Sequence, residues 1–330
     1  MKKALGKILG FFLILGIILT QLNRIFSFKY EDGIRQMEQF YRQEKGTVDV
    51  LVLGSSHAFV DIDPAVLYER QGIAAYDLCA SMQSTWHTYY DLKEALKYQK
   101  PKLVVMDVFR IVENFNYSKE SKLIKSVYGM RPSRDKLEAI RAGLSEEEQA
   151  SAYLYFLEFP SYHSRYTDLT EEDFTDHPSK LAGYKGYYPA TEVTELKRPR
   201  VEDISERYPI EEKTKEYFIR ILKLAKENNI PVLLINAPYR MSEDDKRVYN
   251  SLEDLLEELS AEYPTVYVDF NRMYDELGLD FEVDFADEDH LNRTGVQKLD
   301  SYLADYLAAH YELPDRREDA RFASYLCNQF

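Results

Sequence analysis

The sequence predicts an α/β protein built on a five-stranded, doubly wound parallel sheet. Two observations lead to this fold class. From residue 49 onward, short apolar runs alternate with amphipathic helical stretches, which is typical of parallel strands joined by crossover helices. The chain also shows no internal repeat and no low-complexity tract, so a repeat architecture is excluded.

Five short apolar runs are the predicted strands. They cover residues 49–53, 74–78, 103–107, 232–236 and 266–269. Such strands are buried by helices on both faces of the sheet. In sheets of this kind ligands bind beyond the carboxyl ends of the strands.

Helices are predicted between these strands from apolar periodicity and from capping residues. The predicted helices cover residues 64–70, 85–98, 135–156, 211–227, a stretch after 242, and 294–308. Asp63 caps the first of them with Pro64 at its first position, and Ser242 with Asp245 forms a capping box. The regular pattern stops over residues 111–210, which we interpret as an insertion into one domain that spans residues 30–330.

The first 29 residues differ from the rest of the chain. Residues 8–20 carry no charge, and the apolar stretch extends over 4–22 if Lys7 snorkels to the headgroups. Residues 21–26 lack the small residues of a cleavage site. We therefore expect an uncleaved single-pass anchor over 1–29 at the cell membrane, rather than a cleaved signal peptide or a buried core helix. Three lysines before the stretch predict a cytoplasmic N-terminus and an extracytoplasmic body.

Charge is divided unevenly along the chain. Of the 42 basic residues, five lie in 1–29, where there is no acidic residue. The remaining residues carry all 57 acidic side chains and a net charge of −20, which argues against nucleic acid as a partner. Two cysteines, Cys79 and Cys327, exclude a disulfide scaffold and a cysteine-built zinc site but leave one bridge between them open.

The residues with the clearest chemistry lie in two short segments. Gly54-Ser55-Ser56-His57 follows the first predicted strand, and Asp287 and His290 lie three residues apart just before the last helix. A serine nucleophile needs a base, and the base needs an orienting carboxylate. Ser56, His290 and Asp287 supply these three roles, with the carboxylate holding Nδ1 while Nε2 faces the serine.

These two segments resemble the motifs of the SGNH/GDSL hydrolase superfamily, whose fold is flavodoxin-like. The resemblance maps the nucleophile to Ser56 and the Asp-x-x-His motif to Asp287 and His290. It is greatest to envelope-associated members, similar to proteins of D-alanyl-lipoteichoic-acid transfer and alginate O-acetylation. It implies a serine esterase or O-acyltransferase acting on acyl esters of a cell-envelope polymer, with a membrane-bound O-acyltransferase as partner and no cofactor or metal.

The chain departs from the family pattern at the oxyanion hole. Residues 77–83 hold no glycine, so the second backbone donor, beside the Ser56 amide, is expected from Ala80 or Ser81. No asparagine directly follows the third strand; Arg110 lies nearby and Asn114 is a distant candidate. Three consequences stay open: a slower enzyme, Arg110 or His57 as the donor in place of the asparagine, or a requirement for a particular acyl donor.

Basic residues elsewhere are candidates for binding an anionic or acyl-bearing substrate. His163 and Arg165 lie two apart on a segment expected to be extended, so both side chains would point the same way. Arg165 has a structural alternative, an ion pair with Asp168 or Glu172. Arg240 follows the fourth strand at its ligand-binding end. The aromatic residues around 159–188 are expected either to stack on sugar rings or to form the insertion's own core.

Three alternative interpretations stay open at this point. Residues 54–58 resemble the G-x-S-x-G elbow of an α/β-hydrolase, although the last glycine is missing. Asp284, Asp287, Asp289 and His290 are candidate ligands of a hard metal such as Mg²⁺ or Ca²⁺. The third interpretation is that the chain is an inactive envelope protein that keeps the fold and binds glycan or a membrane partner.

Overall fold

A computed structural model shows the predicted five-stranded parallel sheet, with strand order β2-β1-β3-β4-β5. The structure describes residues 2–112, 116–157, 163–175, 179, 181–201 and 203–326. The strands are β1 (Val50–Gly54), β2 (Ala75–Cys79), β3 (Leu103–Asp107), β4 (Val232–Asn236) and β5 (Val266–Asp269). This 2-1-3-4-5 order is the flavodoxin-like doubly wound order, so the predicted fold class is confirmed.

Helices cover both faces of the sheet, because alternate strand side chains feed two separate cores. Leu51 and Leu53 of β1 face one core, and Val50 and Val52 face the other. The first core is covered by α5 (Thr85–Ala95), α11 (Glu212–Glu227) and α12 (Glu243–Leu259). The second is covered by α3 (Ser56–Asp61), α4 (Pro64–Gln71), α13 (Tyr274–Leu277) and α14 (Arg293–His310).

Helix α3 was not predicted, because the sequence interpretation began the first helix at Pro64. Ser55, with extended backbone, precedes α3, and Ala58, Phe59 and Val60 bury its apolar side. The helix ends at Asp61, where the backbone returns to an extended conformation before Asp63 and Pro64. The consequence is that Ser56 stands at the start of a helix and not on an irregular turn.

The insertion is more broken than predicted. The single helix expected over 135–156 is wrong: the structure has α7 (Arg134–Gly143), η3 (Gln149–Ser151) and α8 (Ala152–Leu157) there. Leu144 takes an extended conformation and ends α7. The rest of the described insertion holds η2 (Phe109–Val112), α6 (Glu120–Val127), η4 (His163–Thr167) and α10 (Glu171–Phe174).

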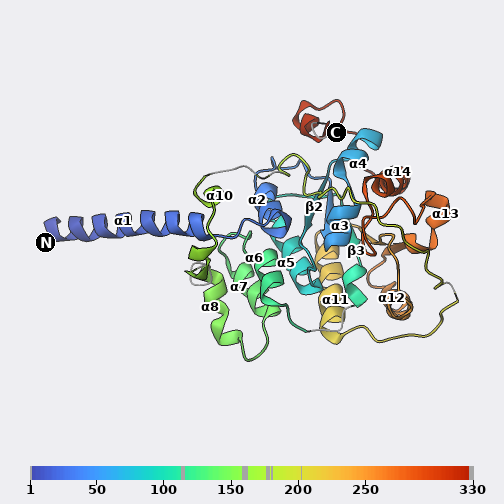
Figure 1. The fold of residues 1–330 in the computed structure, drawn as a ribbon, viewed down its shortest axis with the longest axis horizontal. Helices are drawn as coiled ribbons and strands as arrows, with labels where there is room; N and C mark the ends of the chain where they lie inside the picture. The colour runs from blue at the N-terminus through green and yellow to red at the C-terminus, as the bar shows by residue number, and fades with distance from the viewer. Residues whose placement is uncertain are drawn as a thin grey trace.

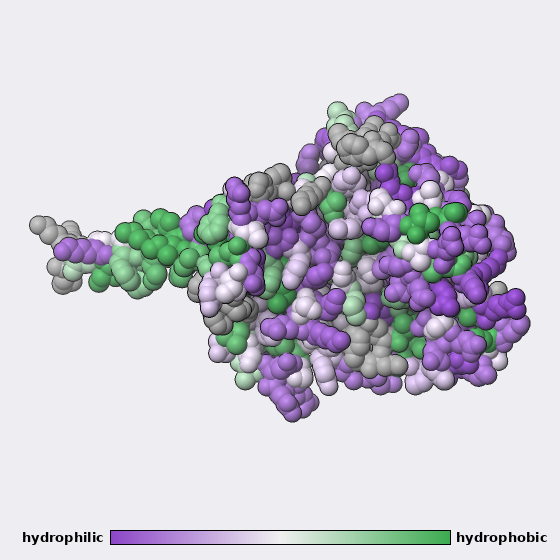
Figure 2. Space-filling view, viewed as in Figure 1, coloured by the Kyte–Doolittle hydropathy of each residue, from purple (hydrophilic) through white to green (hydrophobic). Residues whose placement is uncertain are grey.

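Helix α1 (Lys2–Phe26) extends away from the body (Figure 1). Its segment Ala4–Phe26 is long and apolar enough to span a membrane, and none of its most apolar window is buried. In the space-filling view its middle is strongly hydrophobic, whereas hydrophilic residues dominate the visible face of the body (Figure 2). This arrangement is consistent with a signal anchor or a signal sequence.

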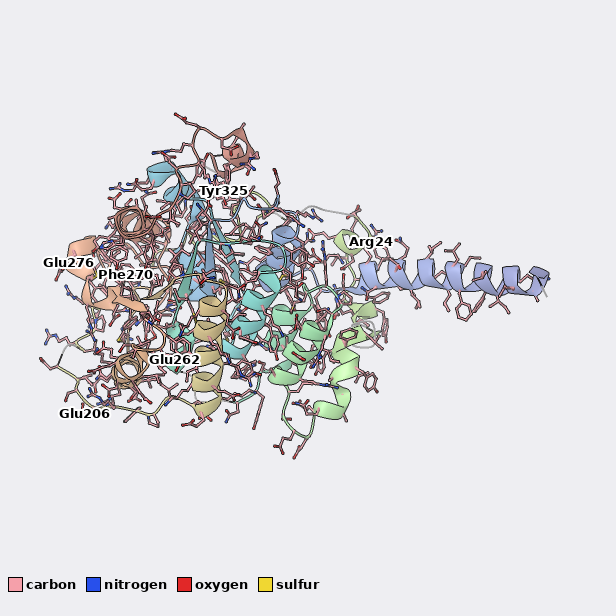
Figure 3. All side chains as sticks on the ribbon, turned by 180° about the vertical axis from the view of Figure 1, so that it is seen from behind. Arg24, Glu206, Glu262, Phe270, Glu276 and Tyr325 are labelled. Carbon is pink, nitrogen blue, oxygen red and sulfur yellow. The ribbon has the colours of Figure 1, made fainter. Side chains whose placement is uncertain are left out.

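Two terminal segments that sequence reasoning left unassigned also pack on the body. After α1, η1 (Glu31–Arg35) and α2 (Gln36–Phe40) bury Ile34, Met37 and Phe40 in the first core. At the other end, η6 (Ala320–Leu326) lies over β2, where the Tyr325 hydroxyl donates to the Ala75 carbonyl at 2.7 Å (Figure 3). Short η5 (Phe270–Arg272) follows β5.

Candidate active site

The strand register brings the predicted site residues to one edge of the sheet. Gly54 pairs with Cys79, so Ser55-Ser56 and Ala80-Ser81 leave neighbouring strands at the same carboxyl edge. On the other side Leu53 pairs with Met106, which places Asp107 beside Gly54. Gly54 has φ +150°, and a Cβ there would lie 3.1 Å from that of Asp107. Only glycine therefore allows this close approach.

The two serines differ in accessibility. Ser55 is 1% exposed, and its buried Oγ has no hydrogen-bond partner among the described residues. Ser56 is partly exposed and begins α3. Its amide lies in the first turn of the helix, where N–H groups have no intrahelical acceptor. Of the two, Ser56 is the serine whose hydroxyl and amide are placed to meet a ligand.

Asp287 and His290 form the pair that their spacing predicts. His290 Nδ1 lies 2.9 Å from Asp287 Oδ1 and 3.0 Å from Oδ2. Oδ1 also accepts the backbone amides of Asp289 at 2.8 Å and His290 at 2.9 Å. Burial alone would raise the Asp287 pKa, but these hydrogen bonds and the nearby imidazole lower it below its ordinary value. The carboxylate is thus held ionised against Nδ1.

The loop that carries this pair is fixed to α3 and to the chain after β4. The Leu291 amide donates to Asp61 Oδ1, at the end of α3, at 2.8 Å. Within the loop the Ala286 amide donates to the His290 carbonyl at 2.9 Å. Arg240 donates its amide to the Glu288 carbonyl and pairs its guanidinium with the Glu288 carboxylate at 3.0 Å. Residues distant in sequence therefore set the position of His290.

His57 is a buried neighbour of both segments. Its ring stacks on Phe109 with 3.5 Å between centroids and lies 5.0 Å from the Tyr239 ring and 5.4 Å from the His290 ring. Neither ring nitrogen has a hydrogen-bond partner among the described residues. Burial, and then the charges of His290 and Arg110, hold the His57 pKa well below its ordinary value. His57 is therefore a neutral ring that packs among Phe109, Tyr239 and His290.

Nε2 of His290 is buried and accepts no hydrogen bond from any described residue, Ser56 included. The structure thus shows the predicted contact between Asp287 and His290, and it shows no hydrogen bond between Ser56 and His290 Nε2. Catalytic hydrogen bonds are often loose without substrate. The buried, unpartnered nitrogen is the group that a serine hydroxyl or a ligand has to satisfy.

Asp107 is a site residue that sequence reasoning did not assign. It is 2% exposed, and its carboxylate accepts the amides of Phe109 at 3.0 Å and Ala237 at 3.1 Å. Burial raises its pKa to about 7, although these hydrogen bonds and the charge of His290 act in the opposite direction. The available signal was its place at the carboxyl end of the third predicted strand. Phe109, Tyr239 and Asp61 were missed as well, because their contacts with the site are long-range.

The predicted oxyanion donors have separate outcomes. The Ser81 amide donates to Asp32 Oδ2 at 3.1 Å, so it is not a free donor here. Asp32 comes from η1, a segment that sequence reasoning did not place near the site. Ala80 is fully buried directly after β2 and stays the predicted second donor.

Arg110 links the sheet edge to a groove. With Gly54 and Asp107 it lines a cavity of about 10 Å³, the size that holds one water. It also lines a groove of about 850 Å³ between the turn after β2 and the insertion, with Met82, Lys119 and Lys122. Burial lowers the Arg110 pKa to about 10, which leaves the guanidinium charged at neutral pH.

Two other predicted substrate residues lie elsewhere. His163 and Arg165 belong to the 3-10 helix η4, not to an extended segment, and the His163 side chain lies outside the described residues. Arg165 donates to the carbonyls of Phe26 and Ser27, both at 2.7 Å, and pairs with Asp173 at 3.0 Å. It therefore attaches the insertion to the end of α1, and its acidic partner is Asp173 instead of Asp168 or Glu172.

The metal interpretation gains no support from the part of the chain that the structure describes. Asp284 forms an ion pair with Lys298 at 2.5 Å and accepts the Asp280 amide, so it faces away from a shared ligand. No group of three or more His, Cys, Asp or Glu among the described residues is placed to hold a metal ion. Cys79 is buried, and Cys327, like Asn114, lies outside the described residues.

A scan against protein-family models finds none that matches this chain, and a search of curated proteins finds no significant match. The chemistry of the site is therefore inferred from its own residues.

Proposed function

We propose that this protein is a membrane-anchored serine esterase or O-acyltransferase of the SGNH/GDSL kind. The observation that carries the proposal is the Asp287–His290 pair, whose Nε2 is buried and has no partner among the described residues, and whose ring lies 5.4 Å from that of His57, the residue after Ser56. A carboxylate on Nδ1 fixes the proton there and leaves Nε2 as a proton acceptor. That arrangement suits the activation of a hydroxyl nucleophile.

In the proposed mechanism Ser56 Oγ attacks the carbonyl carbon of an ester while His290 Nε2 takes its proton. The tetrahedral oxyanion is held by the amides of Ser56 and Ala80. Collapse breaks the ester C–O bond, and His290 returns the proton to the leaving alcohol. Water or a second hydroxyl then attacks the acyl-Ser56 ester while His290 Nε2 takes its proton, and collapse breaks the acyl–Oγ bond as His290 returns the proton to Ser56 Oγ. Water gives hydrolysis, and a sugar hydroxyl gives acyl transfer.

The groove at Arg110 supports a polymeric or headgroup-bearing substrate. At about 850 Å³ it has the volume of a ligand site, and its end at Arg110 adjoins the cavity beside Gly54 and Asp107. Its charged lining is mixed, with the three cations Arg110, Lys119 and Lys122 and the four acids Glu120, Glu146, Glu147 and Glu148. The proposed substrate is an acylated cell-envelope polymer, whose hydroxyl and charged groups this mixed lining would contact, with a membrane-bound O-acyltransferase as the source of the acyl group.

The uncleaved anchor is part of the same proposal. Arg165 and Lys29 connect the last turn of α1 and the residues after it to Asp173 of the insertion. These contacts make residues 26–29 part of the folded body, which favours a helix that stays attached. The body then lies outside the membrane with the N-terminus inside.

Covalent labelling tests the proposal. The full chain in detergent is treated with a fluorophosphonate probe, and the modified peptide is mapped. We expect modification at Ser56 that S56A abolishes and that the matched S55A variant retains. Absence of modification in a folded chain, or modification that survives S56A, would reject the serine-nucleophile mechanism and leave the inactive, glycan-binding alternative.

A further inference from the structure

We infer that the foot of α1 holds a binding site for the phosphodiester of an anionic phospholipid headgroup. A pocket of about 250 Å³ opens where α1 meets the body, between the end of the helix, α2 and the insertion. Four of its ten lining residues are cationic and one is acidic. The cations are Arg24, Lys29, Arg35 and Arg42, and the acid is Glu38. This balance is opposite to that of the body, whose net charge is −20.

The height of the pocket matches the phosphate level of a bilayer. The candidate span Ala4–Phe26 has 23 residues, which at 1.5 Å per residue gives roughly 35 Å, slightly more than the ~30 Å hydrocarbon core. Its last turn therefore reaches the headgroup layer. Arg24 lies at that end of α1, next to the body (Figure 3). In either orientation of α1 the pocket faces the leaflet next to the body.

Two of the cations are available for a ligand. Lys29 is held by Asp173 at 3.0 Å, and Arg35 lies 3.7 Å from Glu31. Arg24 and Arg42 are exposed, and neither forms a salt bridge with a described residue. Guanidinium groups bind phosphate through parallel N–H donors, and Ser27 and Thr175 add hydroxyls to the lining.

The residues around the pocket are joined to the body by several contacts, unlike those of a basic tail that extends from a fold. Arg165 joins the carbonyls of Phe26 and Ser27 to Asp173, and its guanidinium lies 5.1 Å from the Phe28 ring centroid. The Ser179 hydroxyl donates to Glu31 at 2.5 Å. A bound headgroup would therefore fix the orientation of the acidic body on the membrane surface. This inference depends on α1 lying in the membrane but not on catalysis.

Native mass spectrometry of the full chain in nonionic detergent tests the site with dihexanoyl phosphatidylglycerol as the probe. The test variant is R24Q/R42Q. The charge-matched control is R198Q/R207Q, in a region on the far side of the body from α1, where Figure 3 labels Glu206. A basic residue near a membrane surface contributes about 1 kcal/mol, so we expect roughly 25-fold weaker binding in the test variant and no change in the control.

Three results would overturn the inference. The first is equal binding of the probe by both variants. The second is binding of dihexanoyl phosphatidylcholine by the wild type as tightly as the phosphatidylglycerol probe. The third is displacement of the probe by millimolar inorganic phosphate, which would indicate a free-phosphate site. Flotation with phosphatidylcholine vesicles tests the membrane anchor separately, since both variants are expected to float. Fluorophosphonate labelling of R24Q/R42Q should match the wild type, which keeps this inference distinct from the proposed catalysis.

Discussion

The orienting role of Asp287 gives the sharpest prediction about the site. In the D287N variant the retained oxygen still accepts the amides of Asp289 and His290, which lie 2.8 and 2.9 Å from Oδ1. The second oxygen, 3.0 Å from His290 Nδ1, becomes an NH₂ donor. We expect this NH₂ to donate to Nδ1 in preference to Nδ1 donating to the retained oxygen 2.9 Å away, which already accepts two amides, so the neutral imidazole carries its proton on Nε2. A protonated Nε2 cannot take the proton of Ser56.

The expected loss is therefore one of rate and not of fold. Replacing the aspartate of a serine–histidine–aspartate triad by asparagine lowers the rate about 10⁴-fold in the best-studied case, which equals about 5.5 kcal/mol of activation free energy. We expect a fall of ~10³- to 10⁴-fold in the rate constant for fluorophosphonate labelling. The Asp287 side chain is 59% exposed, so the free energy of unfolding should change by less than about 1 kcal/mol.

Two readouts decide this prediction together. The labelling rate constant is measured for wild type and D287N, and the His290 tautomer is determined from ¹⁵N chemical shifts. A labelling rate within tenfold of wild type, or a His290 ring that keeps its proton on Nδ1 in D287N, would refute the reasoning.

Two further predictions concern stability. Burial raises the pKa of Asp63, the cap of α4, to about 6. The folded state therefore favours the protonated carboxyl, and the stability that this gives is fully present below about pH 4 and is lost as the pH rises through 6. D63N keeps a capping side chain and should raise the free energy of unfolding at pH 7.5 by about 3 kcal/mol in urea titrations; an unchanged pH dependence would contradict this. R165K loses two hydrogen bonds to backbone carbonyls and should speed amide exchange over residues 163–175 by about 30-fold, whereas R134K should not; equal exchange in both would contradict the docking role of Arg165.

Local sequence patterns were sufficient for the sheet. The bounds predicted for β3, β4 and β5 match the structure, and β1 and β2 lie one residue later than predicted. A continuous apolar run between helical stretches indicates a strand that is buried on both faces of the sheet, and this signal lies within the run itself. The Asp287–His290 contact was predictable for the same reason, since both residues belong to one four-residue loop.

Features that depend on distant parts of the chain were not predictable in this way. The Ser81 amide donates its hydrogen bond to Asp32, 49 residues earlier. The Leu291 amide donates to Asp61, 230 residues away, and this contact holds Leu291 in place. The role of Arg165 was ambiguous because only the folded chain brings it to Phe26 and Ser27. One-sequence reasoning can identify the reactive residue types but not which of their hydrogen-bonding groups the fold already uses.

The structure shows where the candidate substrate-binding arginines lie on the acidic body. Of the arginines considered for an anionic substrate, Arg110 lies in the groove at the sheet edge, Arg240 is paired with Glu288 at the rim, and Arg165 belongs to the foot of α1. Cationic residues outnumber acidic ones in the pocket at the base of the helix, by four to one, whereas the groove is lined by three cations and four glutamates. Of these two places, the base of the helix is therefore the one where an anionic ligand meets less repulsion.

Trapping of an acyl-enzyme tests the central claim most directly, because hydrolysis and transfer share this intermediate. The full chain is incubated with p-nitrophenyl acetate, quenched with acid and digested, and the peptide that contains residues 54–60 is analysed by mass spectrometry. The account predicts one added acetyl group on Ser56, absent from S56A and from H290A. An unmodified Ser56 in a protein that still releases p-nitrophenol, or acetyl on Ser55 instead, would contradict it.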